Sequence, residues 1–509
     1  MILALLLALQ ASAPVPSYDE LVAAGIAEAR AGRTGAARQV LDRAVLLDPA
    51  RPEAWVERSG VDFLEKRYRE AADGLARALA LRDDAYAREL RASALALQGR
   101  TVEALAEWNR LGAPVVGTVA IEGLARTHDR VARREVAAAE GALLRADAFR
   151  ETRLRLREVG VFPRVRLRLV PRERGRADLA VALTERHGFG PWRVLAVTAA
   201  ADLAREQVRL GYFDLGGAGV VVRAEYKWER TQPRVAGQIA WPRPLGLPAK
   251  LLVSGLRARP TYRFGGGDLV TLRTRGVDLA LRRVIGPRTV VEAGWRRRVR
   301  TFDAVLPGAP SGGLSAATAA VEHALVDGPR DRLEVRLRAH VAAEALGSAV
   351  RYSQGAAAVR YERALGDDAE ETLATGFAAR ALYGWGGDGT PLDAMFAAGA
   401  GAESELPLRG HDLKEGGVLG ASPIARALLL VNLEWRQRIV TRHGLGLAVA
   451  GFTDVARPSR SVGGDDRLLA DAGIGLRVAA GGTVFRVDQG WSLSRDGRSA
   501  LSAGFGRSF

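Results

Sequence analysis

The stretch Leu429-Leu430-Val431-Asn432-Leu433-Glu434-Trp435-Arg436-Gln437-Arg438-Ile439 decides the fold class of this 509-residue chain. Its odd-numbered positions are almost all apolar, whereas positions 432, 434, 436 and 438 carry polar or charged side chains. This period of two predicts a β-strand with two unlike faces. A soluble sandwich would bury the apolar face inside the protein. A membrane barrel would turn that face to lipid and leave the charged face in a wet lumen.

The same alternation continues from about residue 190 to the C-terminus. Runs such as Val277–Leu281 and Thr289–Val299 alternate, are separated by Gly, Pro and Asp, and show no helical period. No stretch of the chain has the ~20 consecutive apolar residues of a spanning helix, so any membrane residence has to come from strands. About 320 residues at ~20 per strand and turn allow ~16 strands. We therefore expect residues 188–509 to form a transmembrane antiparallel β-barrel of about 16 strands.

The end of the chain agrees with a barrel. Leu501, Ala503, Phe505 and the terminal Phe509 share one face of the last predicted strand. Outer-membrane barrels place aromatic residues at the membrane interfaces. We treat Phe505 and Phe509 as the signature of the last barrel strand.

The N-terminus has the pattern of a signal peptide. The apolar run Met1–Leu9 is followed by Ala11-Ser12-Ala13 and then by Pro14. An apolar segment ending in A-x-A is typical of a secretory cleavage site, although the basic residues that usually precede it are missing. We predict a signal peptide over residues 1–13; a buried helix or a short membrane anchor is the alternative.

Residues 18–112 contain a repeat of about 34 residues. Small residues and a proline occur at Gly25, Gly32, Ala37, Ala44 and Pro49. Shifted copies of this pattern pass through Trp55, Ala71 and Ala78, and then through Gly99, Ala104 and Trp108. This period predicts tetratricopeptide-like helix pairs, whose stacks usually present a concave docking surface. An ordinary bundle of helical hairpins is the alternative.

A compact domain is predicted over residues 115–187. Its pattern is a β-like run over 115–123, helices over 130–140 and 145–160, and two alternating strands near 164–169 and 179–183. The order is therefore βααββ. The most informative strings are Val119-Ala120-Ile121-Glu122-Gly123, Arg133-Arg134-Glu135, Glu140-Gly141-Ala142, Val159-Gly160-Val161-Phe162-Pro163-Arg164-Val165, Val170-Pro171, Asp178-Leu179-Ala180-Val181 and Thr184-Glu185-Arg186. Together they closely resemble a POTRA domain, in particular the last POTRA before the barrel in outer-membrane assembly factors of the BamA/TamA/FhaC type.

A second resemblance to this family lies within the predicted barrel. The segment Leu408-Arg409-Gly410-His411-Asp412 resembles the [V/L]-R-G-[F/Y] tip of the loop that folds back into the lumen. In the family, the arginine meets an acidic group on an F-x-D-x-G strand, which Gly451-Phe452-Thr453-Asp454-Val455-Ala456 resembles. The resemblance implies Asp454 as the first partner of Arg409 and the inward-facing Glu434 as the second, with Phe452 beside them. A guanidinium can hold a carboxylate bidentately, which suits such an anchor.

Two positions depart from the family pattern. His411 replaces the usual aromatic residue, and Ala456 replaces the usual glycine. These differences leave open how the loop tip packs against the wall.

Several classes of chemistry have no basis in the sequence. The chain has no cysteine, its six histidines form no H-E-x-x-H pair, and no Walker loop or G-x-S-x-G elbow is present. We therefore expect no enzyme activity, no cofactor and no metal. The net charge of +16 would suggest nucleic-acid binding, but only four of the 74 basic residues are lysine, which indicates a coding bias toward arginine. We expect no nucleic-acid partner, and we assign the arginine-rich run Trp295–Arg300 to the lumen or rim of the barrel.

The family resemblance extends over residues 116–509 and implies an insertase or translocase without nucleotide hydrolysis. The implied partners are unfolded outer-membrane or secreted client proteins and outer-membrane lipid. The helical repeats would add a periplasmic chaperone or accessory protein. The alternatives are an exopolysaccharide-export porin with tetratricopeptide repeats, a passive porin or adhesin, and a soluble arginine-rich binding protein. The export porin would not be expected to carry a POTRA domain or an R-G lumen tip.

Overall fold

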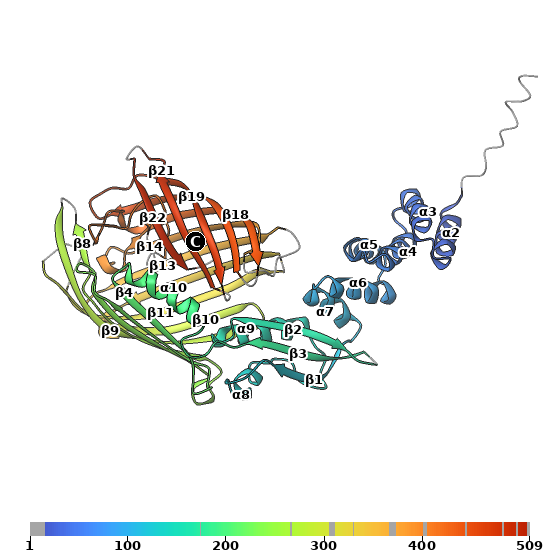
Figure 1. Ribbon diagram of the computed structural model, residues 1–509, viewed down its shortest axis with the longest axis horizontal. Helices are drawn as coiled ribbons and strands as arrows, with labels where there is room; N and C mark the ends of the chain where they lie inside the picture. The colour runs from blue at the N-terminus through green and yellow to red at the C-terminus, as the bar shows by residue number, and fades with distance from the viewer. Residues whose placement is uncertain are drawn as a thin grey trace, which may run out of the picture. The chain divides into compact units, whose positions relative to one another are not determined.

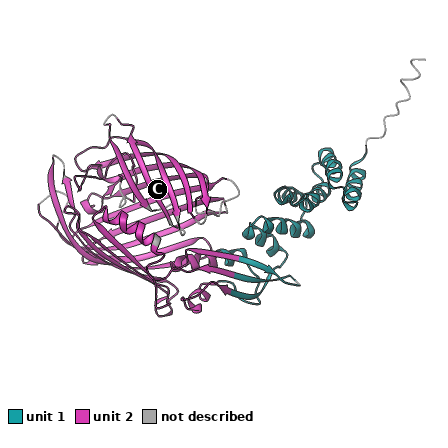
Figure 2. Ribbon diagram, in the orientation of Figure 1, with its two compact units in different colours: residues 1–120, 137–150, 168–180 teal, residues 121–136, 151–167, 181–509 magenta. Residues whose placement is uncertain are grey.

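A computed structural model describes residues 16–173, 175–264, 267–304, 311–328, 330–365, 373–400, 405–442, 445–480, 483–494 and 497–505 (Figure 1). The predicted signal peptide 1–13 and Phe509 lie outside these residues, and only the backbone of Phe505 is described. The chain divides into two compact units. One contains residues 1–120, 137–150 and 168–180, and the other contains the remainder (Figure 2).

The N-terminal region consists of helical hairpins, as the repeat predicts. Small residues allow the helices to approach closely: a Cβ added at Gly25 would lie 2.5 Å from Cγ of Leu41, and Ala37 and Ala44 are completely buried. The helices are α2 (Tyr18–Arg30), α3 (Thr34–Leu47), α4 (Pro52–Leu64), α5 (Tyr68–Leu81), α6 (Ala85–Leu97) and α7 (Thr101–Arg110).

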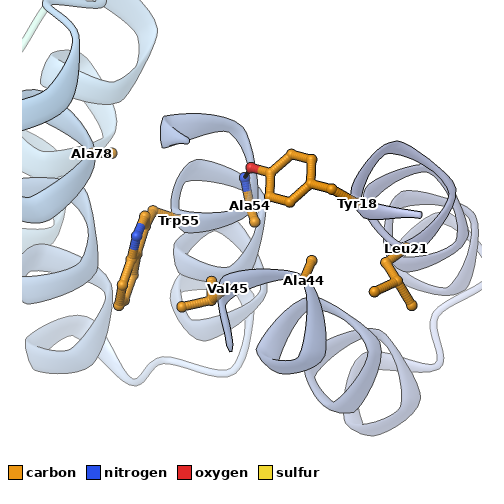
Figure 3. Packing of buried hydrophobic residues seen from close by; sticks show 7 residues of the cluster. All are labelled: Tyr18, Leu21, Ala44, Val45, Ala54, Trp55 and Ala78. Atoms are coloured by element: carbon orange, nitrogen blue, oxygen red, sulfur yellow. Dashed lines mark hydrogen bonds between the residues drawn. The ribbon is translucent and has the colours of Figure 1, made fainter. Parts of the chain in front are cut away.

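One apolar cluster joins the first two hairpins (Figure 3). The hydroxyl of Tyr18 on α2 accepts a hydrogen bond of 2.9 Å from the backbone N–H of Ala54 on α4. The indole of Trp55 donates to the carbonyl of Pro49 at 3.0 Å. Polar groups that would be costly to bury unpaired are thus satisfied between successive repeats.

The small domain, residues 115–187, has a three-stranded sheet with the order β1-β3-β2. Its elements are β1 (Val115–Glu122), α8 (Asp129–Arg133), α9 (Ala146–Val159), β2 (Arg164–Pro171) and β3 (Arg176–Thr184). The prediction of a helix over 130–140 was wrong beyond Arg133. Gly141 and Ala142 instead exchange backbone hydrogen bonds with Val116 of β1, at 2.9 and 2.8 Å, so tertiary pairing overrides the local helical pattern.

The described residues of the remaining chain form a closed barrel whose order contains nineteen strands, β4 to β22. Four of them have four residues or fewer, which explains why the sequence suggested only about 16. The strands are β4 (Gln207–Leu215), β5 (Val220–Lys227), β6 (Arg234–Pro242), β7 (Lys250–Ala258), β8 (Thr261–Phe264), β9 (Asp268–Ile285), β10 (Thr289–Phe302), β11 (Gly312–Asp327), β12 (Asp331–Ala342), β13 (Tyr352–Ala364), β14 (Gly376–Gly386), β15 (Phe396–Ala397), β16 (Lys414–Glu415), β17 (Val418–Leu419), β18 (Ile424–Arg442), β19 (Leu445–Ser461), β20 (Leu469–Ala480), β21 (Thr483–Ser492) and β22 (Ser499–Phe505).

The apolar face of the barrel strands points outward. On β18, Leu433 and Trp435 are 42% and 46% exposed, whereas Asn432 and Glu434 are buried on the inner face. Leu501 of β22 is likewise exposed. Apolar side chains thus lie outside and polar side chains inside, which is the opposite of a soluble sandwich. This arrangement confirms the barrel interpretation.

A helix within the predicted barrel region is a correction to the sequence analysis. Helix α10 (Trp192–Leu203) precedes β4, although no helical period was expected after residue 190. Asp202 at its end accepts hydrogen bonds from the side chains of Gln207 and Arg209 on β4, which fix the turn between them. The run is rich in alanine, which favours a helix even without an amphipathic pattern.

Short 3-10 turns occur at Pro244–Gly246, Glu344–Leu346 and Leu392–Ala394. No helix among the described residues is both long and apolar enough to cross a membrane.

Part of the small domain contacts one end of the barrel, which we call the small-domain rim. The Thr127 hydroxyl lies 3.0 Å from Asp214 of β4, and Arg153 lies 2.5 Å from Asp327 of β11. Glu158 of α9 contacts Lys250 and Arg282 at 3.1 and 2.8 Å. Burial alone would raise the pKa of Glu158, but the hydrogen bond from Arg282 and the charge of Lys250 outweigh it and lower the pKa to about 2.

We expect Glu158→Gln to weaken the attachment of the small domain. Because the folded-state pKa is below the ordinary value of 4.5, the carboxylate stabilises the folded protein above that pH, and this contribution is lost as the pH falls toward 2. The temperature at which the small domain becomes protease-sensitive should therefore drop at pH 7, and the difference from the parent should shrink between pH 5 and pH 2. The exposed Glu173→Gln is the control. An equal drop at pH 7 and pH 2 would contradict this role for the charge.

Candidate functional site: an arginine-tipped loop on the inner wall

The site is built on four neighbouring strands, β18 to β21. Their register aligns Asn432, Asp454 and Asp471 in one row across the inner face. The next row contains Glu434, Phe452, Gly473 and Gly490. Successive side chains of a strand point to opposite faces, and the apolar ones point outward. Both rows therefore lie on the inner face of the barrel.

The segment between β15 and β16 brings the loop tip Leu408–His411 onto these rows. Arg409 is only 1% exposed. Its Nε and Nη2 atoms each donate a 2.8 Å hydrogen bond to Asp454, and its backbone N–H donates to the same carboxylate at 3.0 Å. Its Nη1 atom donates to Glu434 at 2.7 Å, and its guanidinium lies 3.6 Å above the ring centre of Phe452. The structure thus brings together all of the partners that the resemblance implied for Arg409.

The rest of the tip is held by Asp471, which the sequence analysis did not single out. Its carboxylate accepts hydrogen bonds from the backbone N–H of Gly410 at 2.5 Å and lies 2.8 Å from Nδ1 of His411. His411 therefore replaces the family's aromatic residue with a polar contact. Its side chain is completely buried, so this contact is shielded from water.

Leu408 and Ala456 form the apolar side of the tip. Leu408 is fully buried and belongs to a cluster that contains Ala456, 1% exposed, in the position where the family has glycine. The extra methyl group therefore packs beneath the loop. Leu382, Ala398, Leu428, Leu430 and Leu469 complete the buried part of this cluster.

A second arginine connects the partners of Arg409. Arg477 of β20 donates to Glu434 at 2.9 Å and to Asp488 of β21 at 2.6 Å. All three side chains are fully buried. Asp454 likewise accepts a second hydrogen bond, from Nδ2 of Asn432 at 2.8 Å. Each of these carboxylates thus has a donor besides Arg409, which offsets the cost of burying its charge.

Two glycines shape the wall beneath the tip. A Cβ at Gly490 would lie 2.2 Å from the carbonyl oxygen of Arg409, and one at Gly473 would lie 2.3 Å from the ring of Phe452. The tip backbone and the ring thus occupy the space that two missing side chains leave. Sequence reasoning assigned no contact with the tip to Gly490, Asp471, Asp488, Arg477 or Asn432, although it placed Asn432 on the polar face of its strand. Alternation could have placed all five on the inner face, but not beside the tip.

The remaining predicted features lie elsewhere in the barrel. Arg296 and Arg298 of β10 pair with Asp278 on the inner face, and Arg300 pairs with Asp393 at 2.6 Å. This is the arginine-rich run that the sequence analysis assigned to the lumen or rim. Among the described residues, no group of three or more imidazole and carboxylate side chains is placed to hold a metal ion.

The fold is a closed β-barrel preceded by a small βααββ domain. Among solved structures, CdiB from Escherichia coli matches 77% of this chain and 75% of its own, with 14% identity and a TM-score of 0.50. CdiB from Acinetobacter baumannii matches 77% and 73%, with 13% identity and a TM-score of 0.48. BamA from Haemophilus ducreyi lacking POTRA domains 1–3 matches 77% and 83%, with 13% identity and a TM-score of 0.43. No family model matches the chain, and no curated protein matches it. The chain therefore shares the barrel fold of CdiB, in agreement with the resemblance found in its sequence.

Proposed function

We propose that this protein inserts client polypeptides into the outer membrane or translocates them across it, without nucleotide hydrolysis. One observation carries the proposal: an arginine-tipped loop is held on the inner wall of a barrel whose N-terminal neighbour is a βααββ domain. Neither a passive porin nor a polysaccharide exporter requires both features. Outer-membrane residence, with the helical and small domains in the periplasm, is part of the proposal.

The small domain provides a first binding site for a client polypeptide. Strand β2 lies at the edge of the sheet, and an extended peptide can add to such an edge through backbone hydrogen bonds. The other edge strand, β1, is already bonded to residues 141 and 142. We therefore assign client binding to β2. The helical repeats provide a second surface for a periplasmic chaperone or accessory protein.

Depletion of the protein tests this function. We expect a specific set of outer-membrane or secreted proteins to fall in abundance, and expression of the wild-type chain to restore them. A variant with proline at Leu167 of β2 should restore them poorly, because proline blocks strand addition. Unchanged proteomes would reject the proposal. If only exported polysaccharide disappeared, the function of an exopolysaccharide-export porin would be the better explanation.

A further inference from the structure

Four arginines gather on the inner wall beside the Arg409 site, where Arg380 of β14 stands opposite Asn432 of β18. This arginine cluster consists of Arg336 and Arg338 of β12, Arg360 of β13 and Arg380 of β14. Arg360 and Arg380 stand directly opposite each other in the antiparallel register. Like charges in this position destabilise a sheet, and nearby carboxylates such as Glu362, 2.5 Å from Arg360, offset this cost.

The arginine cluster is open to the lumen. The side chains of Arg336, Arg338 and Arg360 are 46%, 42% and 37% exposed. On these strands the neighbouring residues Leu337 and Val359 point outward and are also exposed, so the arginines face inward. They lie four to seven residues inside the strand ends of the small-domain rim, so a chain reaches the cluster from within the lumen.

A carboxylate from the lumen loop already lies on this cluster. Glu405 precedes the loop tip and contacts Nη1 of Arg338 at 3.0 Å, while its backbone carbonyl accepts a 2.9 Å hydrogen bond from Arg380. Its side chain is 78% exposed, so it sits loosely in this position. The other carboxylates on the cluster, Glu322 and Glu362, belong to the wall itself.

We propose that the arginine cluster binds the carboxylates of an acidic stretch of a client polypeptide, and that Glu405 occupies this place while no client is bound. Guanidinium groups hold carboxylates through paired, charge-assisted hydrogen bonds, and several of them on one wall bind successive side chains of an extended segment. Displacement of Glu405 would loosen the loop next to its anchored tip. This inference rests on the proposed function and names the chemistry of the client.

Binding of a fluorescent hexaglutamate peptide to the purified full-length protein tests the inference. In fluorescence polarisation at physiological salt, the double variant Arg360→Gln/Arg380→Gln should bind about tenfold more weakly than the parent. Glu405→Gln should bind several-fold more tightly, because the internal competitor is removed. Arg223→Gln, on the inner face of β5 and hydrogen-bonded to Gln238, should leave binding unchanged.

Three outcomes would overturn the inference: unaltered affinity in the double variant, unaltered affinity in Glu405→Gln, or equal binding of hexaglutamate and inorganic tripolyphosphate at the cluster. The Glu405→Gln measurement remains decisive if the double variant does not fold, because Glu405 is a surface side chain. Peptide binding is measured without any client insertion. Unchanged proteomes on depletion would therefore reject the proposed function, whereas the peptide measurement would still show whether the cluster binds carboxylates.

Discussion

Replacing Arg409 by alanine should destabilise the barrel and release the lumen loop. The change leaves Asp454 and Glu434 buried without their shared guanidinium, and removing one member of a buried ion pair costs about 3–5 kcal/mol. The ring of Phe452 also loses the cation above it. We expect a lower free energy of unfolding in urea for the purified, lipid-reconstituted protein, together with loss of complementation in the depletion strain.

Two further variants separate charge from geometry. Arg409→Lys keeps the charge but cannot hold Asp454 bidentately, so it should recover only part of the stability. The exchange Arg409→Asp with Asp454→Arg should restore more function than either single change. An exchange variant no better than the single variants would reject a direct functional contact between these side chains, as would wild-type stability of Arg409→Ala.

Gly490→Ala should displace the loop tip even though it removes no interaction. The new Cβ would lie 2.2 Å from the carbonyl oxygen of Arg409 and 2.4 Å from its carbonyl carbon, so the tip has to move away from the wall. Overpacking of this kind costs about 1–3 kcal/mol. Movement of the tip also lengthens the hydrogen bonds to Asp454 and Asp471. We expect a reduced free energy of unfolding, and greater protease cleavage of the loop between β14 and β18.

Gly451→Ala provides the matched control. Gly451 lies on β19, two strands away from β21 in the barrel, and a Cβ built there would meet no atom within 4 Å. Both variants add one methyl group to a barrel strand, but the one at Gly490 meets the loop tip, whereas the one at Gly451 lies on the exposed outer face. Equal effects of the two substitutions would show that the position of Gly490 beneath Arg409 does not matter.

The combined effect of Arg409→Ala and Gly490→Ala follows from the same geometry. Both substitutions disturb the contact of the same loop tip with the barrel wall. Their losses in free energy of unfolding should therefore be less than additive. Additive costs would indicate that Gly490 affects the barrel independently of the loop.

Local patterns predicted much of this fold because their periods match regular backbone geometry. Alternation over residues 429–439 determines which side chains face outward, whatever the strand pairs with. Small residues such as Gly25 and Ala37, repeated along the chain, likewise predict positions where two helices pack closely together. The helix predicted beyond Arg133 was wrong because residues 141 and 142 pair with β1, a contact that no local window contains. Helix α10 was missed because its alanine-rich run has no apolar stripe.

The sequence by itself determined the alternating strands, the helical repeats and the βααββ order, since each depends on residue types at short or regular spacing. The candidacy of Arg409, Asp454 and Glu434 came from the resemblance of two short segments to motifs of a known family. Only the tertiary structure decided that Asp471 holds Gly410 and His411, that Arg477 joins Glu434 to Asp488, and that Gly490 makes room for the tip. These contacts join residues that are tens of positions apart along the chain. They depend on the register of four strands and on the fold-back of one loop, and both are fixed by closing the barrel rather than by any local segment.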